Sequence, residues 1–198
     1  MSQSSIKDRW VWMSETKLSR VLVSLLCHPE RETKVSLPEN PAYAVEINRT
    51  EGYANAVRGA ITRAIDLDAD LVFADTDGYH PAKEIERLAT FVSAADMVKP
   101  YRGNIGFQSK VFAYLWSALH RRSVKDVTGG MYRMSNAFLK SLPPLKSDDM
   151  TIHIEILNFA ARRGGTIEQY PYEPAENDRE DSKRTRQYQL KLLGALRR

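Results

Sequence analysis

The chain is poor in the features that stabilise secreted or membrane-embedded proteins. Its 198 residues include one cysteine, Cys27, so no disulfide can form within the chain and a reducing compartment is favoured. It contains no run of about 18 apolar residues, which argues against a membrane-spanning helix. Residues 1–8 lack the apolar centre of a signal peptide. We therefore expect a cytoplasmic protein, with peripheral attachment to a membrane as an alternative.

The composition is that of a globular protein. Hydrophobic residues make up 42% of the chain and charged residues 27%, which are ordinary values for a folded domain. Internal repeats and low-complexity tracts are absent, so we expect one domain, 1–198, in which residues 173–198 form a highly charged tail or helix. The net charge of +4 is compatible with an anionic ligand, a nucleic acid or an anionic membrane surface.

The most informative segment is residues 70–81, Asp-Leu-Val-Phe-Ala-Asp-Thr-Asp-Gly-Tyr-His-Pro. An apolar run ends in Asp75 and Asp77, after which Gly78 predicts a turn and Pro81 the start of a helix. A short apolar run bounded by turn residues is typical of a buried strand, and open α/β sheets bind ligands at the carboxyl ends of such strands. Two carboxylates so close repel each other, and Mg²⁺ or Mn²⁺ relieves this repulsion while also binding diphosphate oxygens. The alternative is a solvated turn, in which Asp and Gly are common.

Strand-like and helix-like segments alternate along the chain. Strands are expected at 21–26, 42–47, 71–75, 96–99 and 166–170, and helices at 52–66, 81–92, 108–122 and 152–163. In the helix at 108–122 we expect Phe112, Leu115 and Leu119 to face inward. This alternation predicts an α/β fold with a mainly parallel sheet that helices cover on both faces.

Five segments, in the same order along the chain, resemble glycosyltransferase family 2, and in particular its dolichyl-phosphate-mannose synthase-like branch. They are Gly-Tyr-Ala-Asn-Ala at 52–56, Asp-Thr-Asp-Gly-Tyr-His-Pro at 75–81, Asp-Val-Thr-Gly-Gly-Met-Tyr-Arg at 126–133, Ile-Glu-Gln-Tyr-Pro at 167–171 and Arg-Glu-Asp-Ser-Lys at 179–183. The resemblance implies the GT-A fold and a metal-dependent, inverting transfer of a sugar from a nucleotide-sugar donor. Residues 1–50 diverge, because they show neither the family's Asn-Glu loop nor its Asp-Asp-Gly-Ser-x-Asp motif. A nucleotide-binding relative without catalytic activity therefore stays open.

The resemblance also implies roles for individual residues. Asp75 and Asp77 are expected to form the site for Mg²⁺ or Mn²⁺. Asp77 would bind the metal directly, and Asp75 would contact the ribose or a metal-bound water. Arg133 is expected at the reacting centre, because a planar guanidinium matches phosphate oxygens bidentately. The residues expected to contact the donor or its phosphates are Gly52, Asn55, Arg102, Gly129, Arg179 and Lys183. The alternative for each arginine is a solvated surface side chain.

The acceptor follows less directly from the sequence. A phosphate acceptor, such as a polyprenyl phosphate at a membrane surface, is already an anion and needs no general base. A hydroxyl acceptor, such as a modified nucleic-acid base, needs one, and Asp148 or Asp149 are the candidates, with Asp149 preferred. Their alternative role is to cap the helix that follows. We expect the polyprenyl-phosphate type, because the motifs resemble that branch.

The histidines show no metal-ligand spacing. His80 is expected to orient the metal loop because it precedes Pro81. For His28, His120 and His153 a surface or core position is expected.

The C-terminal residues 182–198 are basic and contain no acidic side chain. Tyr188, Leu192 and Leu196 recur at helical spacing, which predicts an amphipathic helix. Such a helix suits an anionic membrane surface or a nucleic acid. The simplest expectation is that its leucines pack on the sheet while its charges face water.

Overall fold

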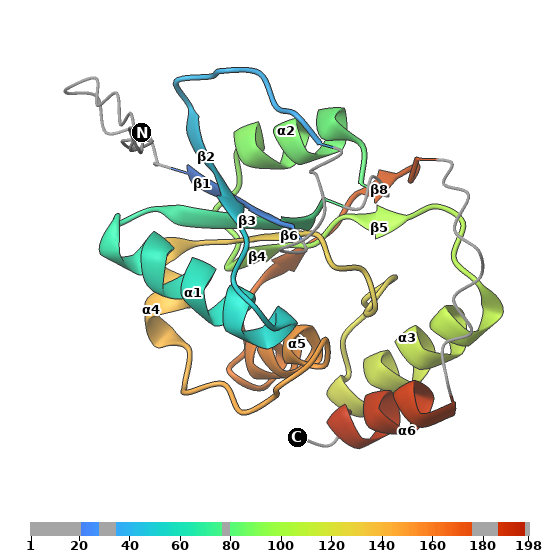
Figure 1. Ribbon diagram of the computed structural model, residues 1–198. Coiled ribbons are helices and arrows are strands. Elements are labelled where there is room, and N and C mark those ends of the chain that lie inside the picture. Colours follow the sequence, from blue (N-terminus) through green and yellow to red (C-terminus); the bar gives the residue numbers. More distant parts are fainter. Residues whose placement is uncertain (1–20, 28–34, 77–79, 176–185, 197–198) are drawn as a thin grey trace, which may run out of the picture.

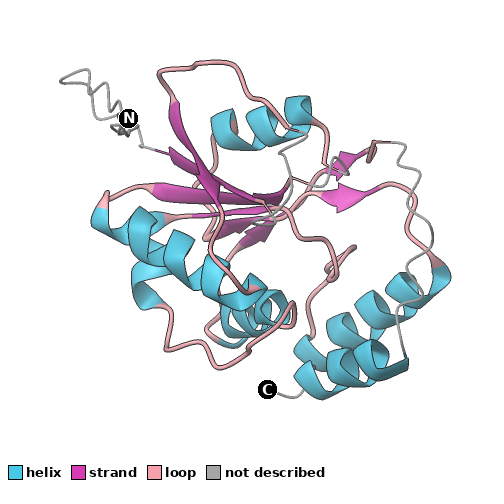
Figure 2. Cartoon of the chain, viewed as in Figure 1, coloured by secondary structure: helices cyan, strands magenta, loops and turns pink. Residues whose placement is uncertain are grey.

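A six-stranded sheet forms the centre of the protein (Figures 1 and 2). The structure is a computed structural model that describes residues 21–27, 35–76, 80–175 and 186–196, without the side chains of 186–190. The strands of the sheet are β1 (Val21–Leu26), β2 (Tyr43–Asn48), β3 (Asp70–Asp75), β4 (Met97–Val98), β6 (Tyr132–Met134) and β7 (Ile167–Glu168). Their spatial order is β2-β1-β3-β6-β4-β7, and only the two pairings made by β6 are antiparallel. The predicted α/β fold with a mainly parallel sheet is therefore confirmed.

Helices cover both faces of this sheet. They are α1 (Tyr53–Asp66), α2 (Ala82–Thr90), α3 (Phe107–His120), α4 (Asn136–Ser141), α5 (Ile152–Arg162) and α6 (Arg186–Ala195). One core contains residues of α1, α4 and α5, and the other contains residues of α2 (Figure 1). None of the described helices is both long enough and apolar enough to cross a membrane.

Strand β3 is central because its side chains enter both cores. Leu71 and Phe73 belong to the core under α1, whereas Val72 and Ala74 belong to the core under α2. All four are fully buried, so an unbroken apolar run is required instead of an alternating one. The strand begins and ends with an aspartate, and these two carboxylates mark its opposite ends.

The predicted strand at 166–170 divides into two short strands. Its first part is β7, and its continuation β8 (Pro171–Tyr172) pairs with β5 (Tyr101–Arg102) in a second, two-stranded sheet. Backbone hydrogen bonds continue across the division, since the amides of Lys99 and Tyr101 donate to the carbonyls of Glu168 and Tyr170. Residues 97–102 and 167–172 therefore run side by side as one interrupted ladder.

The prediction for the inward face of α3 is only partly correct. Phe112 is buried, but Leu115 and Leu119 are 41% and 54% exposed, and Trp116 is buried in their place. Trp116 is the largest apolar side chain of the helix, and its Nε1 donates to Oδ1 of Asn158 in α5 at 2.7 Å. Burial of the indole and this bond together favour the rotation of α3 that leaves the two leucines away from the core.

Two leucines at helix α6 are buried, as predicted, although the surface that receives them is α5, and Leu193 between them is 47% exposed. Leu192 and Leu196 are buried, and α6 packs against α5. The buried Asn158 donates from Nδ2 to the carbonyl of Ala195 at 2.8 Å. Because Asn158 also accepts from Trp116, one amide side chain connects three helices. The side chain of Tyr188 lies outside the described part of the chain.

Candidate functional site

Asp75 lies at the carboxyl end of β3, at the edge where parallel α/β sheets bind ligands. It is in register with Leu26 of β1, which in turn is in register with Asn48 of β2. The next residue, Thr76, closes the strand end, because its amide and its hydroxyl both donate to the carbonyl of Leu26, at 2.9 and 2.8 Å. Asp77 falls within residues 77–79, outside the described ranges.

The backbone of Gly130 packs directly on the Asp75 carboxylate. A Cβ atom added to Gly130 would lie 2.8 Å from Oδ2 of Asp75 and 3.4 Å from the hydroxyl of Tyr53. Real Cβ atoms do not make contacts as short as 2.8 Å. A glycine is therefore required wherever main chain approaches a side chain this closely. Sequence reasoning singled out the neighbouring Gly129, but the contact with Asp75 belongs to Gly130.

A buried carboxylate, Asp126, holds the segment that carries these glycines. Nε and Nη2 of Arg102 donate to its two oxygens at 2.5 and 2.8 Å. The amides of Thr128 and Gly129 donate to Oδ1 at 3.1 and 3.0 Å. Burial alone would raise the pKa of Asp126, but the hydrogen bonds and charge of Arg102 lower it. Arg102 is thus bound to protein, and this geometry does not bring it to a phosphate beside Asp75.

Lys99 completes the support beneath the Gly129–Gly130 turn. Its ammonium is buried and donates to the carbonyl of Gly129 at 2.6 Å. Burial lowers the pKa of Lys99 to about 8, against the opposing attraction of Asp126. The lysine therefore remains protonated at neutral pH, and it adds a positive charge below the carboxyl edge of the sheet.

Three further side chains form a hydrogen-bonded chain next to Asp75. His153, in the first turn of α5, bonds through Nε2 to the hydroxyl of Tyr53 and through Nδ1, at 2.8 Å, to the hydroxyl of Tyr132. Burial, with the charge of Lys99, lowers the pKa of His153 to about 3, so the imidazole is neutral. Burial, with the charge of Asp75, raises the pKa of Tyr132, which keeps its proton.

Sequence reasoning did not assign these three residues to the site. His153 was expected at the surface or in the core, and the core position is correct. A signal existed for the tyrosines, since Tyr53 follows Gly52 and Tyr132 follows the glycine pair inside the family-like segments. The sequence held no comparable signal for His153, because its partners are distant in the chain.

His80 is buried at the start of the α2 segment and bonds through Nδ1 to the hydroxyl of Tyr172 at 2.9 Å. Burial, together with the charges of Arg102 and Lys99, lowers its pKa to about 4. This is the environment of a structural histidine. The hydrogen bond of His80 attaches the segment that precedes α2 to Tyr172 of β8.

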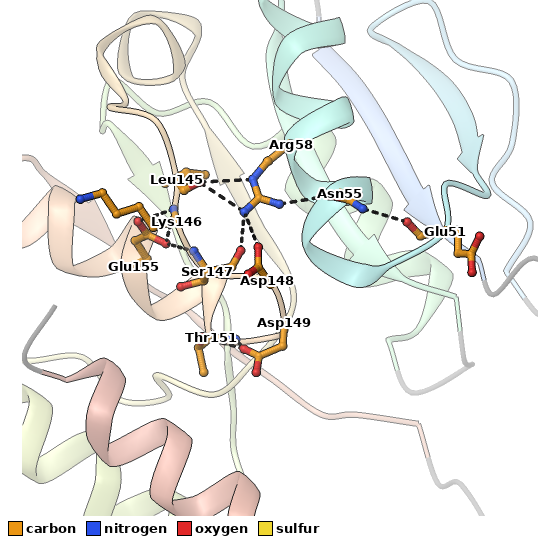
Figure 3. Close-up of polar contacts among 10 residues, drawn as sticks. All are labelled: Glu51, Asn55, Arg58, Leu145, Lys146, Ser147, Asp148, Asp149, Thr151 and Glu155. Atoms are coloured by element: carbon orange, nitrogen blue, oxygen red, sulfur yellow. Dashed lines mark hydrogen bonds and ion pairs between the residues drawn. The ribbon is translucent and has the colours of Figure 1, made fainter.

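Gly52 and Asn55 lie at the amino end of α1, on the same edge as Asp75. Gly52 has φ of 84°, a conformation that side-chain-bearing residues rarely adopt, and its carbonyl accepts the first helical hydrogen bond from Ala56. The exposed Asn55 donates to the carbonyl of Glu51 and accepts from Arg58 (Figure 3). Both residues shape the start of the helix that also carries Tyr53.

Asp149 is held in the turn before α5, where its carboxylate is already bound to protein. Its Oδ1 accepts from the amide and the hydroxyl of Thr151 at 2.9 and 2.7 Å, and its Oδ2 pairs with Lys191 of α6 at 2.9 Å. Burial alone would raise the pKa of Asp149, but the bonds from Thr151 and Lys191 lower it to about 2. A carboxylate with so low a pKa is a weak general base at neutral pH.

The segment before Asp149 is fixed by two charged side chains (Figure 3). Arg58 donates to the carbonyls of Leu145 and Ser147 and contacts the exposed Asp148 at 3.4 Å. Glu155 accepts from the amides of Lys146 and Ser147. Asp148 therefore belongs to the outside of a structural loop.

Arg133 lies at the other end of β3. Its guanidinium pairs with Asp70 at 2.7 Å and donates to the carbonyls of Ala89 and Phe91. Because a strand rises about 3.3 Å per residue, Asp70 and Asp75 are roughly 16 Å apart. The structure does not bring Arg133 to Asp75, and its geometry gives a structural ion pair where the sequence led us to expect a phosphate contact. Arg179 and Lys183 lie outside the described residues.

Among the described residues, no three histidine, cysteine, aspartate or glutamate side chains lie close enough to share a metal ion. Mg²⁺ sites in nucleotide enzymes commonly use one or two carboxylates and take the remaining oxygens from phosphates and water. A carboxylate at the end of a central strand, such as that of Asp75, fits a site of this smaller type.

Solved structures share this fold. One is glucosyl-3-phosphoglycerate synthase from Mycobacterium tuberculosis in complex with uridine diphosphate, which is 16% identical, with the match covering 94% of this chain and 85% of that chain at a TM-score of 0.63. The same enzyme in complex with Mn²⁺, UDP-glucose and phosphoglyceric acid is 16% identical, with 90% and 78% covered and a TM-score of 0.63. Its complex with Mg²⁺ and uridine diphosphate is 17% identical, with 90% and 78% covered and a TM-score of 0.59. No protein-family model and no curated protein sequence matches the chain. At this identity the likeness shows the fold alone, and the predicted GT-A-like fold is confirmed.

The contact between Gly130 and Asp75 predicts a coupled pair of mutations. Gly130→Ala should lower the free energy of unfolding by about 1–3 kcal/mol, because the new methyl group overlaps the carboxylate. Asp75→Ala removes the overlapping atoms, so the double variant should recover most of that loss, as urea unfolding of all four proteins would measure. Gly59→Ala is the matched control, since a Cβ there meets nothing within 4 Å and should stabilise the helix. An additive double variant would show that the two residues do not touch.

The two buried histidines predict acid sensitivity. His80 and His153 have folded-state pKa values of about 4 and about 3, below the value of 6.5 in the unfolded chain. The unfolded state therefore binds protons first as the pH falls below 6.5, and stability decreases toward pH 4 by about 3 kcal/mol per histidine. His80→Gln should flatten this decline, because glutamine has no proton to gain. Urea unfolding from pH 7.5 to 4.5 measures the difference, and equal slopes for the variant and the parent would contradict it.

Proposed function

We propose that this chain is a metal-dependent, inverting glycosyltransferase of family 2 that transfers a sugar from a nucleotide-sugar donor to a phosphate acceptor of the polyprenyl-phosphate type. The observation that carries the proposal is the position of Asp75. It lies at the carboxyl end of the central strand, packed against the main chain of the buried Gly130. Solved structures with this fold include a glycosyltransferase with Mn²⁺ and UDP-glucose bound, which supports the same class of chemistry here.

The surroundings of Asp75 suit a diphosphate with a divalent cation. Asp75 and Asp77 would hold Mg²⁺ or Mn²⁺, which would neutralise the charge that develops on the leaving diphosphate. Below the Gly129–Gly130 turn, Lys99 and Arg102 carry two positive charges against the single negative charge of Asp126. This buried excess of positive charge favours an anionic ligand at the edge above it.

The protein residues at the site act mainly by positioning. The amides of Thr128 and Gly129 are fixed by Asp126, so the Gly129–Gly130 turn keeps its place when a ligand binds. His153 is neutral and bonded on both nitrogens, so it orients Tyr53 and Tyr132 and is not free to exchange protons with a substrate. Rigid surroundings of this kind hold a reacting group in place without later reorganisation.

The acceptor type is inferred from the surroundings of the two candidate bases. Asp149, the preferred candidate, is bound to Thr151 and Lys191 and has a pKa of about 2. Asp148 is exposed and lies on the loop that Arg58 contacts. An ionised phosphate acceptor needs neither residue as a base. The alternative is a hydroxyl acceptor, and the complexes of the M. tuberculosis enzyme with phosphoglyceric acid favour testing a small phosphorylated molecule.

The donor site is tested by Asp77→Ala. The variant should lose Mn²⁺-dependent binding of a nucleoside diphosphate by at least about tenfold, because a metal ligand is deleted. Calorimetry with uridine diphosphate first, and then with the other nucleoside diphosphates, measures the effect. Asp66→Ala is the control, since it removes an exposed carboxylate at the far end of α1. If the parent binds no nucleoside diphosphate with Mn²⁺ or Mg²⁺, the proposed function is wrong.

The type of acceptor is tested by Asp148→Asn and Asp149→Asn. With a phosphate acceptor, turnover should stay within about twofold of the parent, because the attacking oxygen is already ionised. With a hydroxyl acceptor and one aspartate as base, the corresponding variant should be slower by roughly 10²-fold or more. Initial rates with a short-chain polyprenyl phosphate and with phosphoglyceric acid distinguish the two cases. A large loss with the phosphate acceptor would refute the first.

A further inference from the structure

The outer face of α3 is apolar and exposed. Phe107 and Tyr114 are 80% and 73% exposed, and the leucines that were expected to face inward lie on the same side. The exposed residues of this face are Phe107, Val111, Tyr114, Leu115, Ala118 and Leu119. Their spacing of three, four and seven places them on one side of the helix. We call this set the α3 outer face.

This face is unusual because α3 is apolar on its inner side as well. Phe112, Ala113 and Trp116 are buried against the rest of the protein. A helix that is apolar on two sides is more often buried, yet α3, which also carries the exposed Gln108 and Lys110, lies at the edge of the molecule (Figure 1). Contiguous exposed apolar residues usually mark an interaction site.

The charges around the face indicate the kind of partner. Residues 97–125 contain no acidic side chain. Lys110 lies near the start of α3, Arg121 follows its last residue, and Lys125 comes shortly after, and all three are exposed. Basic side chains at both ends of an apolar helix face complement a negatively charged surface with an apolar interior.

We propose that the α3 outer face docks on an anionic phospholipid bilayer, with the helix lying in the plane of the interface. Phe107, Tyr114 and Leu119 enter the boundary between headgroups and acyl chains. Lys110 and Arg121 bind lipid phosphates at the two ends of the helix.

A second copy of the chain fits this surface less well. Two α3 helices related by a two-fold axis run either antiparallel, which brings Lys110 of one copy near Arg121 of the other, or parallel, which brings each of these residues near its own counterpart. Like charges at both ends of such a contact repel each other. The same charges are attracted by a bilayer that contains anionic lipid.

Docking on a membrane also bears on the proposed function, and only this connection to the acceptor rests on that proposal. A polyprenyl phosphate is held in a membrane, so an enzyme that uses it must work at the membrane surface. Vesicle binding needs neither donor nor metal. A failure of vesicle binding can therefore be told apart from a failure of nucleotide binding, which is measured separately on the parent and on Asp77→Ala.

The test is co-sedimentation of the full chain with vesicles of phosphatidylcholine, with or without one-fifth phosphatidylglycerol. The parent should bind the anionic vesicles at least tenfold more strongly than the neutral ones. The double variant Leu115→Gln/Leu119→Gln should reduce that binding by about tenfold or more, because two apolar side chains of the α3 outer face that the bilayer would cover are replaced by polar ones. Lys110→Gln/Arg121→Gln should reduce it by about tenfold and weaken its dependence on salt.

The matched control is Val92→Gln, which removes a side chain that is 97% exposed outside α3. It should bind vesicles like the parent. Each variant should keep the parent's melting temperature and Mn²⁺-dependent nucleotide binding, which shows that the fold and the donor site are intact. Binding that is unchanged in the α3 variants, or absent in the parent, overturns the proposal. A parent dimer that the leucine variant dissociates, without vesicle binding, would assign the face to a second copy.

Discussion

The carboxyl edge of the sheet is held in place by the buried ion pair between Arg102 and Asp126. Arg102 belongs to β5 and Asp126 to the segment between α3 and β6, so the pair joins two regions that are not sheet neighbours. The remaining lone pairs of Asp126 accept the amides of Thr128 and Gly129, which leaves the turn little freedom. Removing one partner of such a pair typically costs about 3–5 kcal/mol, because it strands a buried charge. The position of Gly130 against Asp75 therefore depends on a contact that does not itself touch the carboxylate.

The same pair explains the protonation states around the site. Lys99 is buried beside it, and the charges of Lys99 and Arg102 together disfavour a third positive charge on His80. The charge of Lys99 likewise adds to the effect of burial on His153. Both imidazoles are consequently neutral and can serve as fixed hydrogen-bonding partners of tyrosine hydroxyls. The positive charge that remains lies below the sheet edge, where it favours an anionic ligand.

The sequence predicted local features well and long-range partners poorly. The strand that ends in Asp75 was predictable because four consecutive buried residues need an apolar run, and α1 because its buried residues recur at helical spacing. Strand β6 was missed because Tyr132–Met134 is too short to show a period, and it is antiparallel. Arginines in motif-like segments suggested phosphate contacts, but Arg102 and Arg133 bind buried or half-buried aspartates instead. An arginine side chain matches a carboxylate as well as it matches a phosphate, so the residue type alone could not decide between them.

Helix α3 shows how packing and a polar contact together determine which apolar surface a protein exposes. Its sequence offers two apolar sides, one with Phe112 and Trp116 and one with Leu115 and Leu119. The larger aromatic side chains favour burial of the first side, but the indole N–H of Trp116 would be costly to bury without an acceptor. Asn158 supplies that acceptor and satisfies its own amide at Ala195 of α6. The rotation that buries the aromatic side chains and satisfies both polar groups leaves the leucines on the outside. The exposed apolar face of α3 is thus linked to both packing and hydrogen bonding in the core.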